Sequence, residues 1–543
     1  MVEQFENSRV KLNDSYCRRT QDDQFLEVKM AEMASNPIPH IKEGRKLYQY
    51  LATLVVPMIL LTLIIDNTLM NIAIKINDLK GSPCLPSTLN TNKFSGLAAF
   101  QVGMIIGWTS PVLPYLMSEE SFITVNTEQS SWIGSLLAFG SVLGALPAGN
   151  IADYLGRHRS ILIFNFPFLA SWLLIIFSTN LWLIYAARLL GGIGCGGNCV
   201  LILMYIGEIA EPSVRGTLAS TFGIFLAFGT LYAYIAGTFM SYTLFAVSGA
   251  FFVVLFLILS PFLTESPVWL IKQGRKRDVG KPLLKLRGNE YDIQSEIELL
   301  QIQSTNRASR KGGMRDLIGT KAGRRALLIS VGLSFFQQGS GIDAVIFYTV
   351  TIFRMTGSSI DPFTATVIIG AVEAFMELVC GVVVDRTGRR PLLILSGTGM
   401  TICLFTFGYY FMLKESGDDV RSISWIPLSS LVLYTVFYSI GFGGVPWIMN
   451  SELFPPETKG VAGSISNVLI WTLGFVVVKS FPSLGLRLGE CVIFWFFASL
   501  MTLATFFAIF IVIETKGKTL LQIQAELSGE PFTTDGPRNK GQH

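Results

Sequence analysis

The sequence reads Gly149-Asn-Ile-Ala-Asp153-Tyr-Leu-Gly156-Arg157-His-Arg159 in one place and Gly381-Val-Val-Val-Asp385-Arg-Thr-Gly388-Arg389-Arg390 in another. Both stretches carry one pattern, and each lies between two long apolar runs. In such a pattern a glycine lets helices approach, an aspartate lies where one helix ends, and an arginine can pair with it. Two copies at matching positions indicate a chain built from two duplicated halves.

The residues around these stretches are those of a membrane protein. Half of the chain is hydrophobic and 15% is charged, whereas soluble domains carry about a quarter charged residues. An apolar run of ~20 residues can cross the ~30 Å hydrocarbon core, because a helix pairs its own backbone polar groups. We expect spans at 97–117, 131–152, 160–178, 181–205, 217–239, 242–263, 326–353, 363–384, 391–413, 427–450, 460–480 and 490–513. The predicted fold class is an all-α membrane protein with twelve transmembrane helices in two pseudo-symmetric six-helix bundles.

One long charged connection divides the spans six and six. The resulting segments are a tail at 1–46, an N-terminal half at 97–263, a linker at 264–325, a C-terminal half at 326–513 and a tail at 514–543. Lysine and arginine concentrate in the linker and the tails, and positive charge marks the cytoplasmic side. We therefore expect both termini in the cytoplasm. The amphipathic stretch 292–303 favours short linker helices about as strongly as a solvated loop.

Several function classes find no support in the sequence. It contains no P-loop, no metal-ligand cluster and no Ser/His/Asp set, and its histidines at 40, 158 and 543 lie outside the predicted bundle. We therefore expect no enzyme activity, no metal and no cofactor. The net charge of +4 is a topology signal and does not indicate nucleic acid. The cysteines form no paired extracellular framework, so we expect no structural disulfide.

Further motifs point to one family. The N-terminal half contains Arg188-x-x-Gly191-x-x-x-Cys195, Tyr205-Ile-Gly-Glu208-Ile-Ala leading to Arg215-Gly216, and Glu265-Ser266-Pro267-x-Trp269-Leu270. The C-terminal half contains Gln337-Gln338-Gly339-Ser340-Gly341-Ile342-Asp343-Ala344, Pro446-Trp447 with Glu452-Leu453-Phe454-Pro455, and Glu514-Thr-Lys-Gly-Lys-Thr-Leu520. With the duplicated pattern, these motifs resemble the sugar-porter branch of the major facilitator superfamily over essentially all of 97–520. Within that branch the chain is most similar to the insect facilitated trehalose transporters.

The resemblance implies a function. It implies facilitated diffusion of trehalose or a hexose across the plasma membrane, by alternating access of two halves around a central site. The implied partners are a small-molecule sugar and the lipid bilayer. Two alternatives stay open: a proton-coupled symporter that uses Asp343 or Glu373, and a non-transporting sugar sensor on the same fold. A channel has less support, because no ring-forming selectivity sequence is present.

A sugar-binding site needs particular side chains. Hydroxyl groups donate and accept hydrogen bonds, and the C–H faces of a sugar pack on aromatic rings, so amides, carboxylates and tryptophans are expected. The resemblance places the sugar beside Gln337, Gln338, Asp343, Glu373, Trp447 and Trp471. The glycines at 441, 443 and 444 would let the tenth span break before Trp447. The alternative is that the amides join helices and the tryptophans pack in the core or anchor the interface.

A second set of residues is expected to gate the carrier. They lie at the cytoplasmic helix ends and would hold the halves together in one state and separate in the other, or else act as static scaffolding. The set comprises Gly149, Asp153, Gly156, Arg157, Arg159, Arg188, Glu208, Arg215, Gly381, Asp385, Gly388, Arg389, Arg390 and Glu452.

At some positions the chain departs from the pattern of the family that it resembles. Gly223 stands where a glutamine is usual and Gly474 where an asparagine is frequent, which removes one rim of a hexose site. Glu373 stands where an amide is usual, and it shares a helix face with Glu377. Mutual repulsion and exclusion of water would keep at least one of these acids protonated, which would permit proton coupling. We nevertheless favour uniport, because 97–117 contains no acid where related symporters carry one.

The region before the first span is irregular. Residues 47–56 look like the start of the first span in insect relatives, and they would join smoothly to Leu97. The intervening 57–96 contains a polar, proline-bearing stretch. We interpret 57–96 as an anomalous insertion, such as a retained intron or a gene-model error. The alternative is an extra span or re-entrant hairpin at 47–65.

Overall fold

The computed structural model describes residues 86–209, 215–287, 293–309, 314–358, 360–455 and 457–529. Within these ranges, the side chains at 86–95, 215–221, 262, 287, 303–309, 381, 382 and 385 lie outside the description. The predicted tail at 1–46, the segment 47–56 and most of the proposed insertion also lie outside it. Every described element is helical, which confirms the predicted all-α class.

Seven helices form the N-terminal half. They are α4 (Pro86–Gly107), α5 (Thr109–Leu116), α6 (Thr127–Leu155), α7 (Arg157–Ile176), α8 (Leu181–Ile209), α9 (Arg215–Phe239) and α10 (Tyr242–Leu259). The helices α4 and α5 together make the first candidate span, Gly96–Leu116. Because α4 begins at Pro86, it includes the last part of 57–96, and the interpretation of that segment as an insertion stays a prediction.

The C-terminal half repeats this arrangement with two interrupted spans. Its helices are α15 (Lys321–Gly339), α16 (Ile342–Thr356), α17 (Pro362–Thr387), α18 (Arg389–Glu415), α19 (Ile426–Tyr438), α20 (Val445–Glu452), α21 (Lys459–Leu488) and α22 (Glu490–Phe510). A π-helical segment, η4 (Ser439–Gly443), joins α19 to α20. Eleven helices of the described residues are long and apolar enough to span a membrane. The broken pair α15 and α16 supplies the twelfth span.

The sequence predicts one continuous helix over 326–353. The structure corrects this prediction, because the helix is broken between α15 and α16. The chain leaves the helix at Ser340 and Gly341, and Gly341 has φ +81°. That backbone conformation favours glycine. A Cβ atom at Gly341 would also lie 2.6 Å from the ring of Phe497. Tyr434 fixes the break by donating a hydrogen bond to the Ser340 carbonyl at 3.0 Å.

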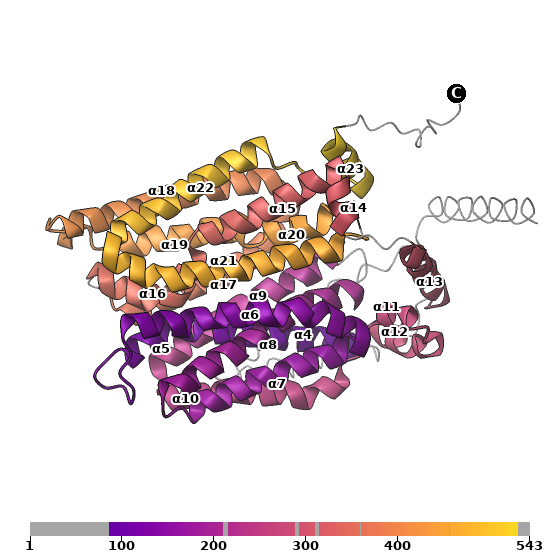
Figure 1. Ribbon diagram of the computed structural model, residues 1–543, viewed down its shortest axis with the longest axis horizontal. Coiled ribbons are helices and arrows are strands. Elements are labelled where there is room, and N and C mark those ends of the chain that lie inside the picture. The colour runs from indigo at the N-terminus through magenta and orange to yellow at the C-terminus, as the bar shows by residue number, and fades with distance from the viewer. Residues whose placement is uncertain are drawn as a thin grey trace, which may run out of the picture. The chain divides into compact units, whose positions relative to one another are not determined.

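Short helices occupy the connection between the halves and the segment after the last span. They are α11 (Pro267–Lys272), α12 (Gly280–Arg287), α13 (Ile293–Ser309), α14 (Met314–Gly319) and α23 (Leu520–Ser528). All five lie at one end of the spanning helices, on the right in Figure 1. We call this the linker end. The far end carries the connections 117–126, 240–241, 357–361 and 416–425.

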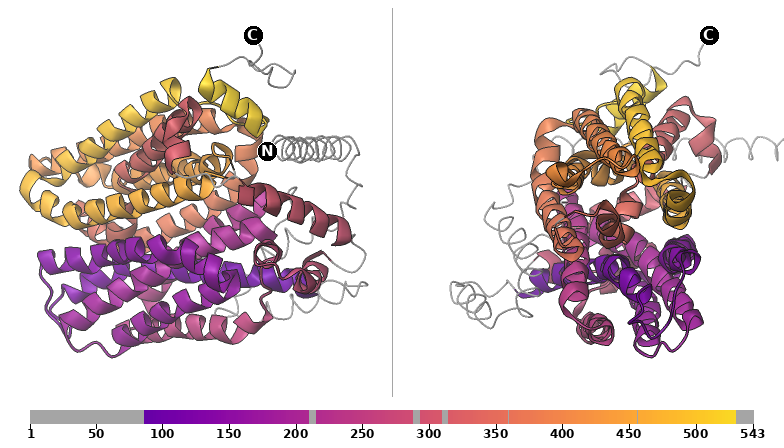
Figure 2. Two further views of the ribbon diagram at one scale, coloured as in Figure 1. Left: turned by 45° about the vertical axis from the view of Figure 1, so that its right-hand side comes forward. Right: turned by 90° about the vertical axis from the view of Figure 1, so that its left-hand side faces the viewer.

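Among the described helices, the two halves meet along the pairs α6 with α21, α9 with α17, α5 with α16 and, over a smaller area, α4 with α16. The views in Figure 2 show the helices of each half grouped together, the N-terminal half in indigo to magenta and the C-terminal half in orange to yellow. The hydrogen bonds that cross between the halves in the described chain gather toward the far end. There Tyr234 donates to the Ile346 carbonyl at 3.0 Å, and the Val350 amide donates to Ser110 at 3.2 Å.

Candidate functional site

A group of polar side chains lies where the interrupted seventh and tenth spans approach α17. We call it the central polar cluster, and its members are Gln337 and Gln338 of α15, Asp343 of α16, Glu373 and Glu377 of α17, and Tyr438 of α19. The ring of Tyr438 interacts electrostatically with all three carboxyl groups. The structure thus brings four of the six predicted sugar-binding residues together.

Gln337 joins two interrupted spans. Its Nε2 donates to the carbonyls of Phe442 at 2.9 Å and Gly443 at 3.2 Å, both in the π-helical segment η4. The glycine-rich break that the sequence predicts before Trp447 is confirmed, and Gln337 holds it. The Gln337 side chain is 3% exposed, and its Oε1 is buried without a hydrogen-bond partner. That oxygen remains able to accept a bond from a ligand.

Gln338 and Asp343 approach α21 at one glycine. A Cβ atom at Gly474 would lie 2.4 Å from Asp343 Oδ2 and 3.8 Å from Gln338 Oε1. The space left by the absent side chain at 474 is therefore occupied by a carboxyl from α16. Gln338 is 5% exposed, and its Oε1 is buried without a partner. Both groups present acceptor oxygens at Gly474, and Trp471 lies one helical turn before it on α21.

Glu377 reaches from one half to the other. A Cβ atom at Gly223 of α9 would lie 3.0 Å from Glu377 Oε2, and one at Gly443 would lie 3.4 Å from Glu377 Oε1. Glu373, one turn earlier on the same helix face, is 7% exposed and interacts electrostatically with Glu377. The Glu377 carboxyl of the C-terminal half thus lies against Gly223 of the N-terminal half, where the family pattern has a glutamine.

The two predicted tryptophans differ in placement. Trp471 on α21 is half-buried, and its indole Nε1 is buried without a partner among the described residues. Trp447 lies on α20, just beyond the break in the tenth span, and is also half-buried. Trp471 is on the same helix as Gly474, one turn before it, and Trp447 is on the helix that follows the break.

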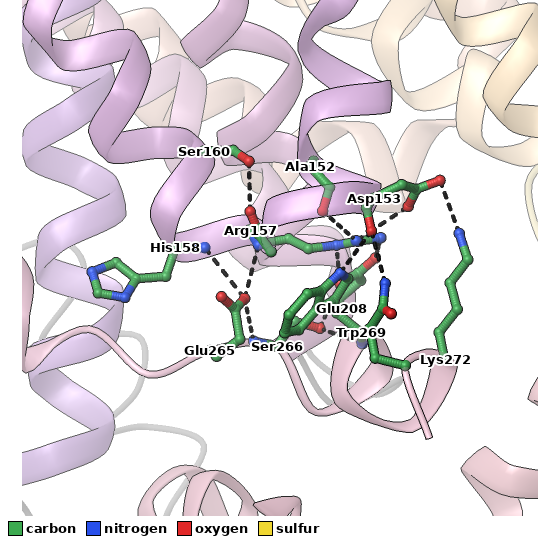
Figure 3. Close-up of polar contacts among 12 residues, drawn as sticks. Ala152, Asp153, Arg157, His158, Ser160, Glu208, Glu265, Ser266, Trp269 and Lys272 are labelled. Carbon is green, nitrogen blue, oxygen red and sulfur yellow. Dashed lines mark hydrogen bonds and ion pairs between the residues drawn. The ribbon is translucent and has the colours of Figure 1, made fainter. Parts of the chain in front are cut away.

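At the linker end, predicted gate residues of the N-terminal half form an ionic cluster around the buried Arg157 (Figure 3). Arg157 donates to both carboxylate oxygens of Glu208, from Nε at 2.8 Å and from Nη2 at 2.7 Å. Its Nη1 lies 3.2 Å from Asp153, which also pairs with Lys272 of α11 at 2.8 Å. Trp269 donates to the Asp153 carbonyl at 3.0 Å. The cluster fixes α6, α7 and α8 to the first linker helix.

Glu265 completes this cluster. Its Oε1 accepts hydrogen bonds from the backbone amides of Arg157 at 2.8 Å, His158 at 3.2 Å and Ser266 at 2.9 Å. A carboxylate at the start of α7 is favourable, because the first amides of a helix lack partners and carry partial positive charge. Gly156, with φ +100°, leaves room for it. Glu265 is not among the residues predicted from the sequence.

The C-terminal half has a matching cluster. Arg389 Nη2 donates to Glu452 at 2.9 Å, and Thr515 donates to the other Glu452 oxygen at 2.5 Å. Glu514 accepts from the backbone amides of Arg389 and Arg390, each at 3.0 Å. Burial raises the pKa of Glu514, but hydrogen bonds from the Lys516, Arg389 and Arg390 amides outweigh it, so this pKa lies below its ordinary value of 4.5.

The remaining predicted gate residues are not brought into these two clusters. Arg188 lies toward the far end, fully buried, where it donates to the Ile105 and Ile133 carbonyls at 2.9 and 3.1 Å. It fastens α8 to α4 and α6 within one half. Arg159 is exposed and Gly149 is half-buried. The Arg390 backbone amide donates to Glu514, but its side chain turns to the Ala508 carbonyl at 3.2 Å. The side chains of Arg215, Gly381 and Asp385 lie outside the described set.

A contact between the halves at the far end was not expected from the sequence. Lys479 of α21 pairs with Glu128 of α6 at 2.5 Å, donates to Ser131 at 2.8 Å, and lies 4.5 Å from the ring centre of Trp132. Its sequence signal is weak, because a lysine near the end of a span is common in membrane helices. Glu265 and Glu514 carry a clearer signal, since a glutamate followed by a hydroxyl residue occurs after both the sixth and the twelfth spans.

The cluster chemistry suits recognition by hydrogen bonds. The described residues contain no group of three side chains suited to hold a metal. The five described cysteines, Cys195, Cys199, Cys380, Cys403 and Cys491, are free. What the central polar cluster offers is acceptor oxygens and one phenol, at the meeting point of both halves.

Known proteins match the chain over most of its length. The family model described as "Sugar (and other) transporter" matches residues 90–527. The facilitated trehalose transporter Tret1 of Drosophila virilis is 37% identical over 80% of this chain and 48% of its own length. The Tret1 of Polypedilum vanderplanki is 35% identical over 82% of this chain and 89% of its own length. The chain thus spans about half of the first relative and most of the second.

Solved structures agree with the fold. The major facilitator superfamily proton:xylose symporter XylE, bound to 6-bromo-6-deoxy-D-glucose, is 25% identical and has a TM-score of 0.67, covering 81% of this chain and 99% of its own. An inward open structure of XylE from E. coli is 24% identical with a TM-score of 0.67, covers 81% and 99%, and shows the fold alone. The predicted twelve-helix fold and the resemblance to sugar porters are confirmed.

Proposed function

The chain belongs to the sugar (and other) transporter family, and from that premise we propose that it carries a sugar across the membrane by facilitated diffusion. The central polar cluster is the observation that carries the proposal. Its acceptor oxygens lie at the meeting point of the two halves, beside the breaks in the seventh and tenth spans. Transporter sites are built from interrupted helices in this position, because unpaired backbone groups there face the substrate.

We propose alternating access as the mechanism. The crossing contacts of Lys479, Tyr234 and Val350 hold the halves together toward the far end. At the linker end, the described ion pairs of Arg157 and Arg389 stay within their own halves. This pattern supports a state closed at the far end. Rocking of one half against the other would then break the far-end contacts and bring the linker-end clusters together.

The orientation follows from the charges. The linker end carries the basic residues of the linker and the tails, so we assign it to the cytoplasm, with both termini on that side. The far end then faces outward, and the membrane is the plasma membrane. The predicted roles of the sugar-binding and gate residues form part of this proposal.

For the substrate we propose trehalose or a hexose. The relatives are named facilitated trehalose transporters, and the solved symporter is bound to a halogenated deoxyglucose. Gly223 and Gly474 border the cluster and stand where the family pattern has longer, polar side chains. Their lack of a side chain supports room for a disaccharide. The carboxyl groups of Glu377 and Asp343 occupy part of that room.

Uptake of radiolabelled trehalose and glucose into cells that lack their own transporters tests the proposal. Saturable uptake that stops at equal concentrations inside and outside is expected. Gln338→Ala should lower it, because an unpartnered buried acceptor is removed from the cluster, whereas Glu120→Gln, an exposed loop change, should leave it intact. Binding of sugar without flux would indicate a sensor and contradict a carrier.

A further inference from the structure

The central polar cluster has an excess of hydrogen-bond acceptors. Its three carboxyl groups, Asp343, Glu373 and Glu377, have no ion pair and no hydrogen bond among the described residues. Gln337 and Gln338 each add a buried Oε1 without a donor. Glu373 is buried, whereas Asp343 and Glu377 are half-buried. Buried acceptors need donors, and a buried carboxylate needs a cation or a proton. The cluster is therefore built for a ligand that brings hydrogens.

Glu373 and Glu377 are the pair for which this need is strongest. They lie at i and i+4 on one face of α17, and they interact electrostatically. Glu373 is 7% exposed. Two like charges at this spacing repel, and neither has a described basic partner to offset the other. One proton would convert a repelling pair into a neutral donor beside a single charge.

The position of the pair links it to the movement of the halves. Glu377 Oε2 lies 3.0 Å from the place of a Cβ atom at Gly223, across the contact between α17 and α9. Its Oε1 adjoins Gly443, whose carbonyl accepts from Gln337 Nε2 at 3.2 Å. Gln337 Oε1, buried and unpartnered, is thus held at the same glycine. A protonated Glu377 is a donor suited to that oxygen.

The groups facing the pair do not supply a positive charge. On α17 itself Cys380 interacts with Glu377, and from α16 and α19 the nearby titratable groups are Asp343, Tyr434 and Tyr438. From α9 the phenol of Tyr234 interacts with Glu373. Each of these is neutral or negative at neutral pH.

We propose that Glu373 and Glu377 bind one proton as a resident ligand of the central polar cluster, and that the halves close only when this proton is bound. The proposal rests on the sugar transport proposed above. If both glutamates were ionised, each closure of the halves would remove water from a second negative charge between α9 and α17, which costs free energy. The pair that holds one proton avoids this cost. Its protonated carboxyl can also donate to Gln337 or to a sugar hydroxyl. Sugar flux therefore falls at alkaline pH, and the proton stays with the protein.

The test is sugar exchange in vesicles that contain the purified full chain, with equal pH on both sides. The range runs from about pH 5.5 to about pH 8.5, where buried carboxyl groups lose protons. The wild type should lose about tenfold in flux per pH unit once the proton dissociates. Glu373→Gln and Glu377→Gln carry an amide in place of the protonated carboxyl, so in each variant the flux at alkaline pH, divided by the same variant's flux at acid pH, should no longer decline.

Two matched controls accompany these variants. Glu120→Gln removes an exposed carboxyl of the far-end loop and should keep the wild-type profile. Glu377→Asp keeps a carboxyl at the pair and should retain the alkaline decline. If neither glutamine variant folds, the wild-type and Glu377→Asp profiles still decide, because a flat profile in either contradicts the proposal.

The outcomes separate this proposal from the transport function. A wild-type flux that does not change with pH, or glutamine variants that still decline, would overturn the proton site and leave sugar transport standing. Absence of flux at every pH would instead overturn the transport function. Sugar accumulation above equilibrium under an acid-outside gradient would show that the proton crosses with the sugar, and so would contradict its resident role.

Discussion

The linker-end clusters of the two halves are copies of one arrangement, whereas the central polar cluster is one-sided. The matched pairs are Gly156 and Gly388, Arg157 and Arg389, Glu208 and Glu452, Glu265 and Glu514, and Ser266 and Thr515. The central polar cluster takes all three of its carboxyl groups from the C-terminal half. Duplication is retained where helices are fastened and lost where we place the ligand.

The two copies also differ in strength. In the N-terminal half, Arg157 is bidentate to Glu208 and has a side chain 5% exposed, and Asp153 adds a bridge to Lys272. In the C-terminal half, the side chains of Arg389 and Glu452 are 10% and 25% exposed. The more buried copy holds the linker. We infer that the N-terminal half is the more rigid partner in the rocking movement.

The largest effect is expected from removing the acid of each ion pair. Glu208→Ala leaves Arg157 buried with Asp153 alone nearby, and breaking a buried pair in this way costs about 3 kcal/mol. Glu452→Ala should cost less, because Arg389 is closer to solvent. Thermal unfolding of both variants in detergent measures the difference. Equal losses of stability in the two variants would show that the two clusters stabilise their halves equally.

Substituting the turn glycines should have the next largest effect. Gly156 and Gly388 have φ of +100° and +105° with ψ of 163° and 161°, a region that side chains rarely adopt. Gly156→Ala and Gly388→Ala should each destabilise by about 1–3 kcal/mol. The first should be the worse, since its Cβ would lie 2.3 Å from Glu265 Oε2, against 2.8 Å from Glu514 Oε2 for the second. Gly417→Ala, with φ +86° in a loop with open space, controls for strain alone.

Glu265→Gln and Glu514→Gln test the charge at the starts of α7 and α18. Each removes a charge that faces helix amides, worth about 1 kcal/mol where partly buried, and Glu514 should contribute less because solvent screens it. The pKa of Glu514 lies below 4.5 in the folded chain. Its contribution is therefore present at neutral pH and is lost as the pH falls through that lowered pKa.

Thermal unfolding at neutral pH and again below pH 4.5 checks the charge at Glu514. The wild type should lose stability between the two conditions, and Glu514→Gln should lose less of it. Lys516→Ala is a control, because its amide, which donates to Glu514, is retained. An equal loss in wild type and Glu514→Gln would show that other carboxyl groups account for the acid sensitivity.

The sequence predicts the duplicated parts of the molecule better than the divergent ones. Arg157 and Glu208 follow from a local pattern that repeats, and a helix end needs the same partners wherever it occurs. The approach of Asp343 to Gly474 could not be predicted, because it depends on the break at Gly341, which rotates α16 relative to α15. Periodicity describes one helix at a time, and contacts between helices depend on their rotation.

The central polar cluster shows the same limit. The sequence identifies Gln337, Gln338, Asp343 and Glu373 as polar groups in apolar spans, which are functional candidates on energetic grounds. It does not reveal that the Gln337 amide nitrogen donates to the π-helical segment, or that the Glu377 carboxyl lies against Gly223 of the other half. Trp447 and Trp471 look equivalent as indoles in neighbouring spans, yet Trp447 lies on the short helix after the break and Trp471 within an unbroken one.

The smallest effect is expected at the far end. There the ion pair of Lys479 with Glu128 joins the two halves, whereas the ion pairs of Arg157 and Arg389 stay within one half. Lys479→Met removes an ion pair that is partly exposed, together with a contact to the Trp132 ring. Exposed pairs contribute little, so we expect a shift of about two- to fivefold toward the state open at the far end. High salt should weaken the same contact in the wild type.

The rate at which a water-soluble maleimide labels Val478→Cys measures that shift in a background without other cysteines. Val478 is fully buried against Gly134 of the opposite half, so it is reached only when the far end opens. Lys518→Met removes a lysine–glutamate pair of similar length, 2.6 Å, at the linker end and should leave the labelling rate unchanged. Faster labelling in Lys479→Met alone would establish Lys479 as the far-end counterpart of the linker-end clusters. Equal labelling in both variants would instead assign far-end closure to the apolar packing of α6 on α21, with the ion pair as a bystander.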